Sequence, residues 1–202
     1  MGLVVLVGVL FAFFREEPQA NVESAAQGSA LAQFTAARQR IDTAAEVLEA
    51  RSTESGEPVR IKIPAIDVDA HIDYVGLTPE GKMDITKDPE DAAWYQPGTR
   101  PGEIGSAVIA GHYGTWADGQ GSVFDLLHTL KKGDKMYVED EAGRETTFVV
   151  RESRRYDPDA DATDVFTSDD GKAHLNLVTC EGEWNTEAER YSKRLVVFAD
   201  KE

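Results

Sequence analysis

The segment 175-LNLVTCEGEW-184 contains the only cysteine of the 202-residue chain. The run that leads to it, AHLNLVTC at 173–180, has the apolar content and the length of a buried β-strand. Cys180 therefore stands where a predicted strand ends and a loop begins. A single thiol cannot form an internal disulfide, so Cys180 is either a buried, inert residue or a reactive one.

Short strand patterns surround this segment on both sides, separated by turn residues. The segment VFDLLHTL at 123–130 fits a short helix with Ser122 as its N-cap, and 94–105 is a Pro/Gly loop. This pattern predicts a mainly β fold, a closed or nearly closed β-barrel of about eight strands with short helices. The strand candidates are 59–64, 70–77, 81–85, 106–112, 135–140, 145–156, 173–180 and 193–199.

Composition restricts the classes of protein to which the chain can belong. Hydrophobic residues make up 41% of the sequence, enough for the core of one domain with appendages. The formal net charge is −16, with 37 acidic residues against 21 Lys and Arg. Such a surface repels nucleic acid and anionic lipid headgroups, which argues against a DNA- or RNA-binding function.

The N-terminal part of the sequence differs from the rest. Residues 2–14, GLVVLVGVLFAFF, are apolar throughout but shorter than the roughly 20 residues that cross a bilayer as a helix. We interpret 1–14 as part of a transmembrane anchor. Residues 15–57 contain an amphipathic pattern and predict a helical stalk or linker, which leaves 58–202 as the strand-rich domain. This order predicts a single-pass membrane protein.

A nucleophilic thiol needs a proton-transfer partner and a cationic environment. His112 ends the apolar segment SAVIAGH much as Cys180 ends its own, so both could meet at one edge of the sheet. His174 lies six residues from Cys180 on the same strand, roughly 20 Å away, and cannot reach it. His128 falls among the leucines of the predicted helix, and His71 is interpreted as an exposed polar residue. The alternative for His112 is a loop residue bonded to a backbone carbonyl.

A thioester-forming enzyme also needs a donor for the developing oxyanion. Arg194 opens the strand that follows Cys180, in YSKRLVVFA, and is the candidate for this role. Arg190 is its rival. In so acidic a protein, a surface salt bridge is the alternative interpretation of Arg194.

The segments AGH, LVTC and KRLVVFA, in this order and in these strand contexts, resemble the three signature segments of the sortases. Sortases are membrane-anchored cysteine transpeptidases of bacterial surfaces, and the resemblance extends over roughly 59–199. It implies that 58–202 is the catalytic domain and that this domain lies outside the cytoplasm. It also implies that His112, Cys180 and Arg194 are the catalytic residues. It also implies that Thr179 is a candidate substrate contact, although a β-branched residue is equally suited to the strand itself.

The resemblance also implies a reaction. Cys180 would attack the Thr–Gly carbonyl of an LPXTG-like sorting signal, and Arg194 would stabilise the oxyanion. His112 would protonate the leaving amine and then deprotonate an incoming one. The implied partners are surface proteins that carry sorting signals and an amine acceptor, either a cell-wall precursor or a pilin lysine.

Some features depart from the general family pattern. The segment EGEWNTEAERY at 181–191 is not a general sortase feature. The subclass most resembled is among the actinobacterial types, classes E and F, whereas KR before the last strand is closer to class A.

The acidic loop 157–172 raises the question of a metal. Asp157, Asp159 and Asp161 stand at alternate positions, as hard oxygen ligands of calcium often do. An EF-hand would next have Gly and Glu, where this chain has Ala162 and Ser168. We therefore expect no cofactor and a solvated loop, with calcium at these aspartates as the alternative. The sortase resemblance implies that this loop helps to recognise the sorting signal.

Two other functions compete with this interpretation. GHYGT at 111–115 faintly resembles a segment of the L,D-transpeptidases, but those enzymes place Gly before the nucleophile and Arg after it. The second alternative is a non-enzymatic, surface-tethered β-barrel binding module with an inert cysteine.

Overall fold

The computed structural model describes residues 36–43, 55–116 and 119–202. Residues 36–43 form an exposed helical segment, within a unit that spans Met1–Arg51. The second compact unit, Ser52–Glu202, contains every strand found in the described residues. The predicted anchor at 1–14 and most of the predicted stalk lie outside the described residues. No helix in the described ranges is long and apolar enough to cross a membrane.

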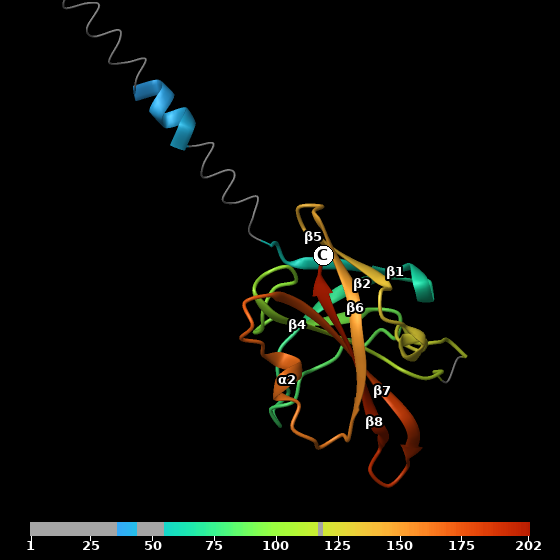
Figure 1. Cartoon of the computed structure of the whole chain (residues 1–202). Coiled ribbons are helices and arrows are strands. Elements are labelled where there is room, and N and C mark those ends of the chain that lie inside the picture. The colour runs from blue at the N-terminus through green and yellow to red at the C-terminus, as the bar shows by residue number, and fades with distance from the viewer. Residues whose placement is uncertain (1–35, 44–54, 117–118) are drawn as a thin grey trace, which may run out of the picture. The chain divides into compact units, whose positions relative to one another are not determined.

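Eight strands close into a barrel in the order β1-β2-β3-β4-β7-β8-β6-β5, which confirms the predicted fold class. Two neighbouring pairs, β2–β3 and β4–β7, are parallel, and the other pairs are antiparallel. Figure 1 shows β7 and β8 running together to a hairpin turn at the bottom of the view. The strands are β1 Pro58–Ile63, β2 Val68–Val75, β3 Ala92–Tyr95, β4 Gly105–Gly111, β5 Lys135–Asp140, β6 Glu145–Tyr156, β7 Ala173–Asn185 and β8 Arg190–Lys201. The short helices are η1 Pro64–Ile66, η2 Leu127–Thr129 and α2 Thr163–Phe166.

Side chains alternate between the two faces of the central strands β4, β7 and β8. One face fills the barrel interior with Ala107, Ile109, Leu175, Leu177, Leu195, Val197 and Ala199. The opposite face carries a second, smaller apolar cluster of Val108, Val178, Val196 and Phe198, which Val165 of α2 covers. Cys180 and Arg194 lie two residues from Val178 and Val196, so the alternation places them at the end of this outer face.

Four sequence predictions differ from the structure. β3 was not predicted, and its second half falls in the segment 94–105, which was predicted to be a loop. Its four residues are too few to show the alternation of a strand. Residues 81–85 are not a strand, and only an isolated bridge joins Leu77 to Met83. Residues 123–130 form turns and the single 3₁₀ turn η2 instead of a longer helix. Ser122 does not cap it, because its hydroxyl donates to the carbonyl of Gly114.

The end of β4 is fixed by close packing around Gly111. A Cβ at this position would clash with the ring of Phe124 and would lie 2.6 Å from Cγ1 of Val123. Phe124 is fully buried in the barrel core. Only glycine therefore lets the chain pass this close to the core just before His112.

Candidate active site

Strand register brings the three predicted catalytic residues together. β4 and β7 are parallel, with Gly111 opposite Thr179, so His112, the first residue after β4, lies beside Cys180, which is still within β7. β7 and β8 are antiparallel, and Cys180 is the direct partner of Arg194. The thiol thus lies between an imidazole on one neighbouring strand and a guanidinium on the other.

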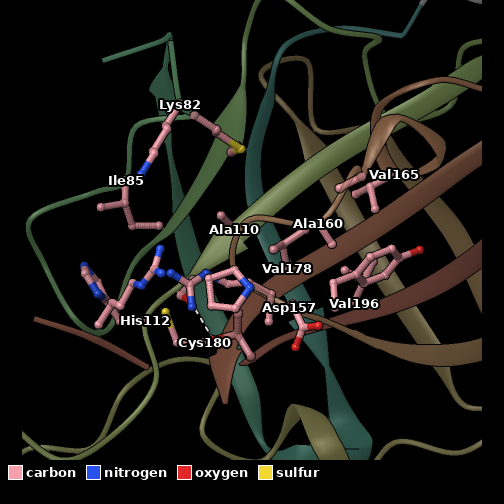
Figure 2. Close-up of a pocket in the computed structure, with 18 of the residues that line it drawn as sticks. Lys82, Ile85, Ala110, His112, Asp157, Ala160, Val165, Val178, Cys180 and Val196 are labelled. Carbon is pink, nitrogen blue, oxygen red and sulfur yellow. Dashed lines mark hydrogen bonds between the residues drawn. The ribbon is translucent and has the colours of Figure 1, made fainter. Parts of the chain in front are cut away.

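A cavity of about 580 Å³ begins at these residues and continues over the outer face of the sheet. In Figure 2, His112 and Cys180 lie at one end of this cavity, and Val165 and Val196 lie at the other. The floor consists of Ala110, Val178 and Val196. The walls come from the segment 82–85, from Tyr156 at the end of β6 and from the β6–β7 segment, which contributes Asp157, Pro158, Ala160, Ala162, Val165 and Phe166.

His112 is held by one hydrogen bond that fixes its tautomer. Its Nε2 donates to the carbonyl oxygen of Thr86 at 2.8 Å. A carbonyl only accepts, so Nε2 keeps its hydrogen and Nδ1 is the nitrogen that can take up or release a proton. Thr86 is itself buried, and its hydroxyl donates to Asp73 at 2.6 Å. The edge of the His112 ring also packs against Trp116, with centroids 5.2 Å apart.

Arg194 is held by its own strand rather than by an acid. Its Nη1 donates to the carbonyl oxygens of Lys193 and Tyr191, at 3.0 and 3.3 Å. Within the described ranges, no carboxylate forms an ion pair with Arg194. The surface salt bridge considered for Arg194 is found instead at Arg190, which forms a bidentate pair with Asp159 at 2.8 Å.

The thiol of Cys180 is partly buried. Burial raises its pKa, and the nearby guanidinium of Arg194 acts in the opposite direction without cancelling the effect. The resting thiol is therefore mostly protonated at neutral pH, and the thiolate is a minor species.

Thr179 has a defined structural contact. The residue is buried, and its hydroxyl donates to the carbonyl oxygen of Gly111 at 2.8 Å. This bond ties β7 to β4 directly beside His112 and Cys180. Thr179 also lines the cavity, so its role as a substrate contact stays a prediction.

The three aspartates considered for calcium already have partners within the protein. Asp157 pairs with Lys193, Asp159 pairs with Arg190, and Asp161 accepts from the backbone and hydroxyl of Thr163. The first two pairs join the β6–β7 loop to the β7–β8 hairpin. No group of three or more potential metal ligands occurs in the part of the chain that the structure describes.

The other histidines lie away from the thiol. His174 is buried and lies between Asp170 and Asp200, with nitrogen–oxygen distances of 2.9 and 2.7 Å. His71 is exposed, as predicted. His128 is exposed as well, and it lies in the 3₁₀ turn η2, where a longer helix was predicted.

Sequence reasoning missed two parts of the site. The carbonyl that orients His112 belongs to Thr86, and a backbone group leaves no trace in the sequence. Met83 and Ile85 form part of the cavity wall, whereas residues 81–85 were predicted from the sequence to form a strand. Two apolar residues in an otherwise polar segment were the available signal for a partly buried position outside a sheet.

Comparison with known proteins extends these observations to a family. The sortase domain family model matches residues 61–202. Sortase C-1 from Actinomyces oris is 26% identical, with a TM-score of 0.54 over 72% of this chain and 75% of that one. Sortase A from Corynebacterium diphtheriae is 24% identical, with a TM-score of 0.56 over 74% of this chain and 62% of that one.

A sortase C from Clostridium perfringens is similar in fold, at 22% identity and a TM-score of 0.53 over 74% of this chain and 72% of that one. Comparison with curated proteins gave no match. The family match covers most of the chain and all of the barrel except the first half of β1, and the solved sortases share its fold. The chain therefore belongs to the sortase family and is a cysteine transpeptidase.

Proposed function

We propose that this protein cleaves an LPXTG-like sorting signal between Thr and Gly and transfers the acyl fragment to an amine. Cys180 is the nucleophile, Arg194 the oxyanion donor and His112 the general acid and base. The observation that carries the proposal is the register that puts Cys180 directly between His112 and Arg194 at the mouth of the cavity. The protein is a cysteine transpeptidase with only one cysteine, which supports the choice of nucleophile.

The first half-reaction forms a thioester. The Cys180 thiolate forms a bond to the threonine carbonyl carbon, and negative charge develops on the carbonyl oxygen. Arg194, which no acid neutralises in the described part of the chain, stabilises this charge. The Thr–Gly C–N bond then breaks, and the leaving nitrogen takes the proton from Nδ1 of His112.

The second half-reaction restores the enzyme. A neutral amine attacks the thioester carbon and forms the new C–N bond. The C–S bond breaks, and its electron pair leaves on sulfur as the thiolate. Nδ1 of neutral His112 accepts the proton that the nitrogen loses, so the next cycle starts from thiolate and imidazolium.

The cavity suits the apolar part of a sorting signal. Its floor is aliphatic, and its outer wall includes Ala162, Val165 and Phe166. A Leu-Pro or Leu-Ala segment placed on this floor would bury apolar surface and leave the following Thr beside the thiol. The β6–β7 loop would thus read the signal, as the sequence suggested.

The location of the enzyme is part of the proposal. The apolar residues 2–14 support a membrane anchor, with the barrel outside the cytoplasm. In that position it would meet surface proteins and either a cell-wall precursor or a pilin lysine as acyl acceptor.

The experiment is incubation of the full chain with a panel of LPXTG- and LAXTG-containing peptides together with small amines. We expect cleavage between Thr and Gly and an amide product with the added amine, both identified by mass spectrometry. Cys180→Ala should give neither product. Cleavage at another bond, or activity that survives in Cys180→Ala, would refute the proposal.

The two competing functions lose their support. The family match and the sortase fold replace the L,D-transpeptidase interpretation, which rested on GHYGT alone. A non-enzymatic binding module is excluded on the same grounds.

A further inference from the structure

Three aromatic side chains gather beside Cys180 without lining the sorting-signal cavity. Tyr113 follows His112, and Trp184 and Tyr191 are direct partners across the β7–β8 hairpin. Tyr191 meets both of the others edge to face, with ring centroids 5.2 Å from Tyr113 and 5.1 Å from Trp184. We name these three residues the aromatic platform.

The platform lies beside the proposed catalytic residues. Tyr113 directly follows His112, and the carbonyl oxygen of Tyr191 accepts a hydrogen bond from Nη1 of Arg194 at 3.3 Å. Burial raises the pKa of the Tyr191 phenol, and the charges of Cys180 and Tyr113 add to that shift. Gly114, at φ +96°, makes room for the ring, because a Cβ there would clash with the Tyr191 hydroxyl. His112, Cys180 and Arg194 line the cavity, whereas none of the platform residues does. The platform therefore offers the thiol a second approach, separate from that of the sorting signal.

The platform is open to solvent at Trp184, and exposed carboxylates lie on the same hairpin. Trp184 is 53% exposed, an unusual position for a large indole on a hairpin. Glu183 and Glu187, on the same hairpin, are exposed. Neither carboxylate forms an ion pair within the described residues. Aromatic faces and unpaired carboxylates both attract a cation.

We propose that the aromatic platform and Glu183 bind the ammonium-bearing acyl acceptor and deliver it to the thioester on Cys180. This inference rests on the proposed function. It identifies where the second substrate of the proposed reaction, the amine acceptor, would bind. Charge complementarity selects the occupant, because the acyl acceptor is the cationic substrate of the reaction. The bound ammonium loses one proton to water before it attacks, as the second half-reaction requires.

The first test measures how the acyl-enzyme divides between aminolysis and hydrolysis. The full chain is acylated with the best-cleaved peptide of the panel and offered 1,5-diaminopentane or hydroxylamine, which is small and uncharged at neutral pH. Trp184→Ala should lower the ratio of amide to acid product about fivefold for the diamine. The ratio for hydroxylamine should not change. Both products come from the same acyl-enzyme, so a change in the rate of acylation does not alter the ratio of amide to acid product.

Matched variants identify the interaction. Trp184→Phe, which keeps an aromatic face, should restore most of the diamine ratio, whereas Trp184→Leu should not. Glu183→Gln should lower the diamine ratio, and Glu141→Gln, on the β5–β6 turn, should not. Ile104→Ala removes an exposed apolar side chain before the opposite end of β4 and should leave both ratios unchanged.

A second measurement does not depend on catalysis. Titration of the full chain with 1,5-diaminopentane, followed by NMR, should give saturable shifts of the Trp184 indole N–H and the Tyr191 amide. Failure to form an acyl-enzyme would overturn the proposed function, but the titration would still test the platform. The platform assignment is overturned if these signals do not move, or if Trp184→Ala affects both nucleophiles equally or neither.

Discussion

At the scale of single residues, the chemistry depends on a thiol whose environment opposes its ionisation. Burial raises the pKa of Cys180, and Arg194 is the group that lowers it. The thiolate is therefore a minority state at neutral pH. In the proposed mechanism Arg194 would have two effects, since it would favour the thiolate before attack and the oxyanion during it.

The pH dependence of thiol alkylation tests this description. The rate of iodoacetamide reaction with Cys180 should rise with pH to a midpoint above about 8.5, the ordinary thiol value. Arg194→Gln should move the midpoint to higher pH, because the lost guanidinium favoured the thiolate. Arg190→Gln is the matched control and should not move it, since Arg190 is already paired with Asp159. A midpoint below the ordinary value, or a downward shift in Arg194→Gln, would contradict the account.

Residue identities were the part of the site most accessible from sequence. His112 and Cys180 each end an apolar segment, and Arg194 begins one, so their positions could be inferred from strand ends. The hydrogen bond from His112 to the carbonyl of Thr86 could not be inferred from the sequence, because every residue carries a backbone carbonyl. The raised pKa of Cys180 could not be predicted from the sequence either, because it depends on burial by side chains that are distant in the chain.

At the scale of elements, the end of β4 positions His112 through the packing of Gly111. Gly111→Ala should lower the free energy of unfolding by about 1–3 kcal/mol, because its Cβ meets the buried ring of Phe124. Activity should fall as well, since His112 follows directly. Gly76→Ala is the control, because no atom lies within 4 Å of its Cβ position. Urea denaturation measures both variants, and a Gly111→Ala protein of unchanged stability and activity would refute the packing argument.

The loop between β6 and β7 is attached to the β7–β8 hairpin by ion pairs, so we expect activity that does not depend on calcium. The double variant Asp157→Asn, Asp159→Asn should raise the KM of the sorting peptide several-fold, about what two exposed ion pairs supply. Its kcat should change less. Asp69→Asn breaks an exposed pair with Arg60 between β1 and β2 and serves as control. Loss of wild-type activity on addition of a calcium chelator would contradict this expectation.

Elements with a clear period were predicted well, and irregular ones were not. Residues 135–140 and 145–156 match β5 and β6 in full, because a turn signal separates two alternating runs. β7 and β8 extend beyond the predicted 173–180 and 193–199 into a polar hairpin, where charge hides the strand pattern. The apolar residues of 123–130 suggested a helix, but Phe124 and Leu127 are buried from a series of turns instead.

At the scale of the whole barrel, the site exists because strands distant in sequence become neighbours. β4 and β7 pair in parallel across more than 60 residues, and this pairing alone joins His112 to Cys180. Short, regular strands predicted a closed barrel, but which strands adjoin depends on long-range packing that local patterns do not specify. The order of the three signature segments supplied that information through a family resemblance.

The barrel should lose stability in acid through Asp170. The hydrogen bond with His174 lowers the pKa of this carboxyl to about 2. A carboxyl whose pKa is lowered by folding stabilises the protein above its unfolded value of about 4, and this contribution disappears as the pH falls through about 2. Asp170→Asn should therefore show a shallower decrease of Tm between pH 4 and 2 than the wild type. Parallel curves for the two proteins would refute the assignment.

The central claim is that His112, Cys180 and Arg194 act on one carbonyl at the mouth of the cavity. Its most direct test is acid quenching of the full chain with a cleaved sorting peptide, followed by intact mass and peptide mapping. The account predicts an adduct of the peptide fragment that ends in Thr, attached to Cys180, absent in Cys180→Ala and strongly reduced in Arg194→Gln. An adduct on any other residue, or one of undiminished yield in Arg194→Gln, would contradict it.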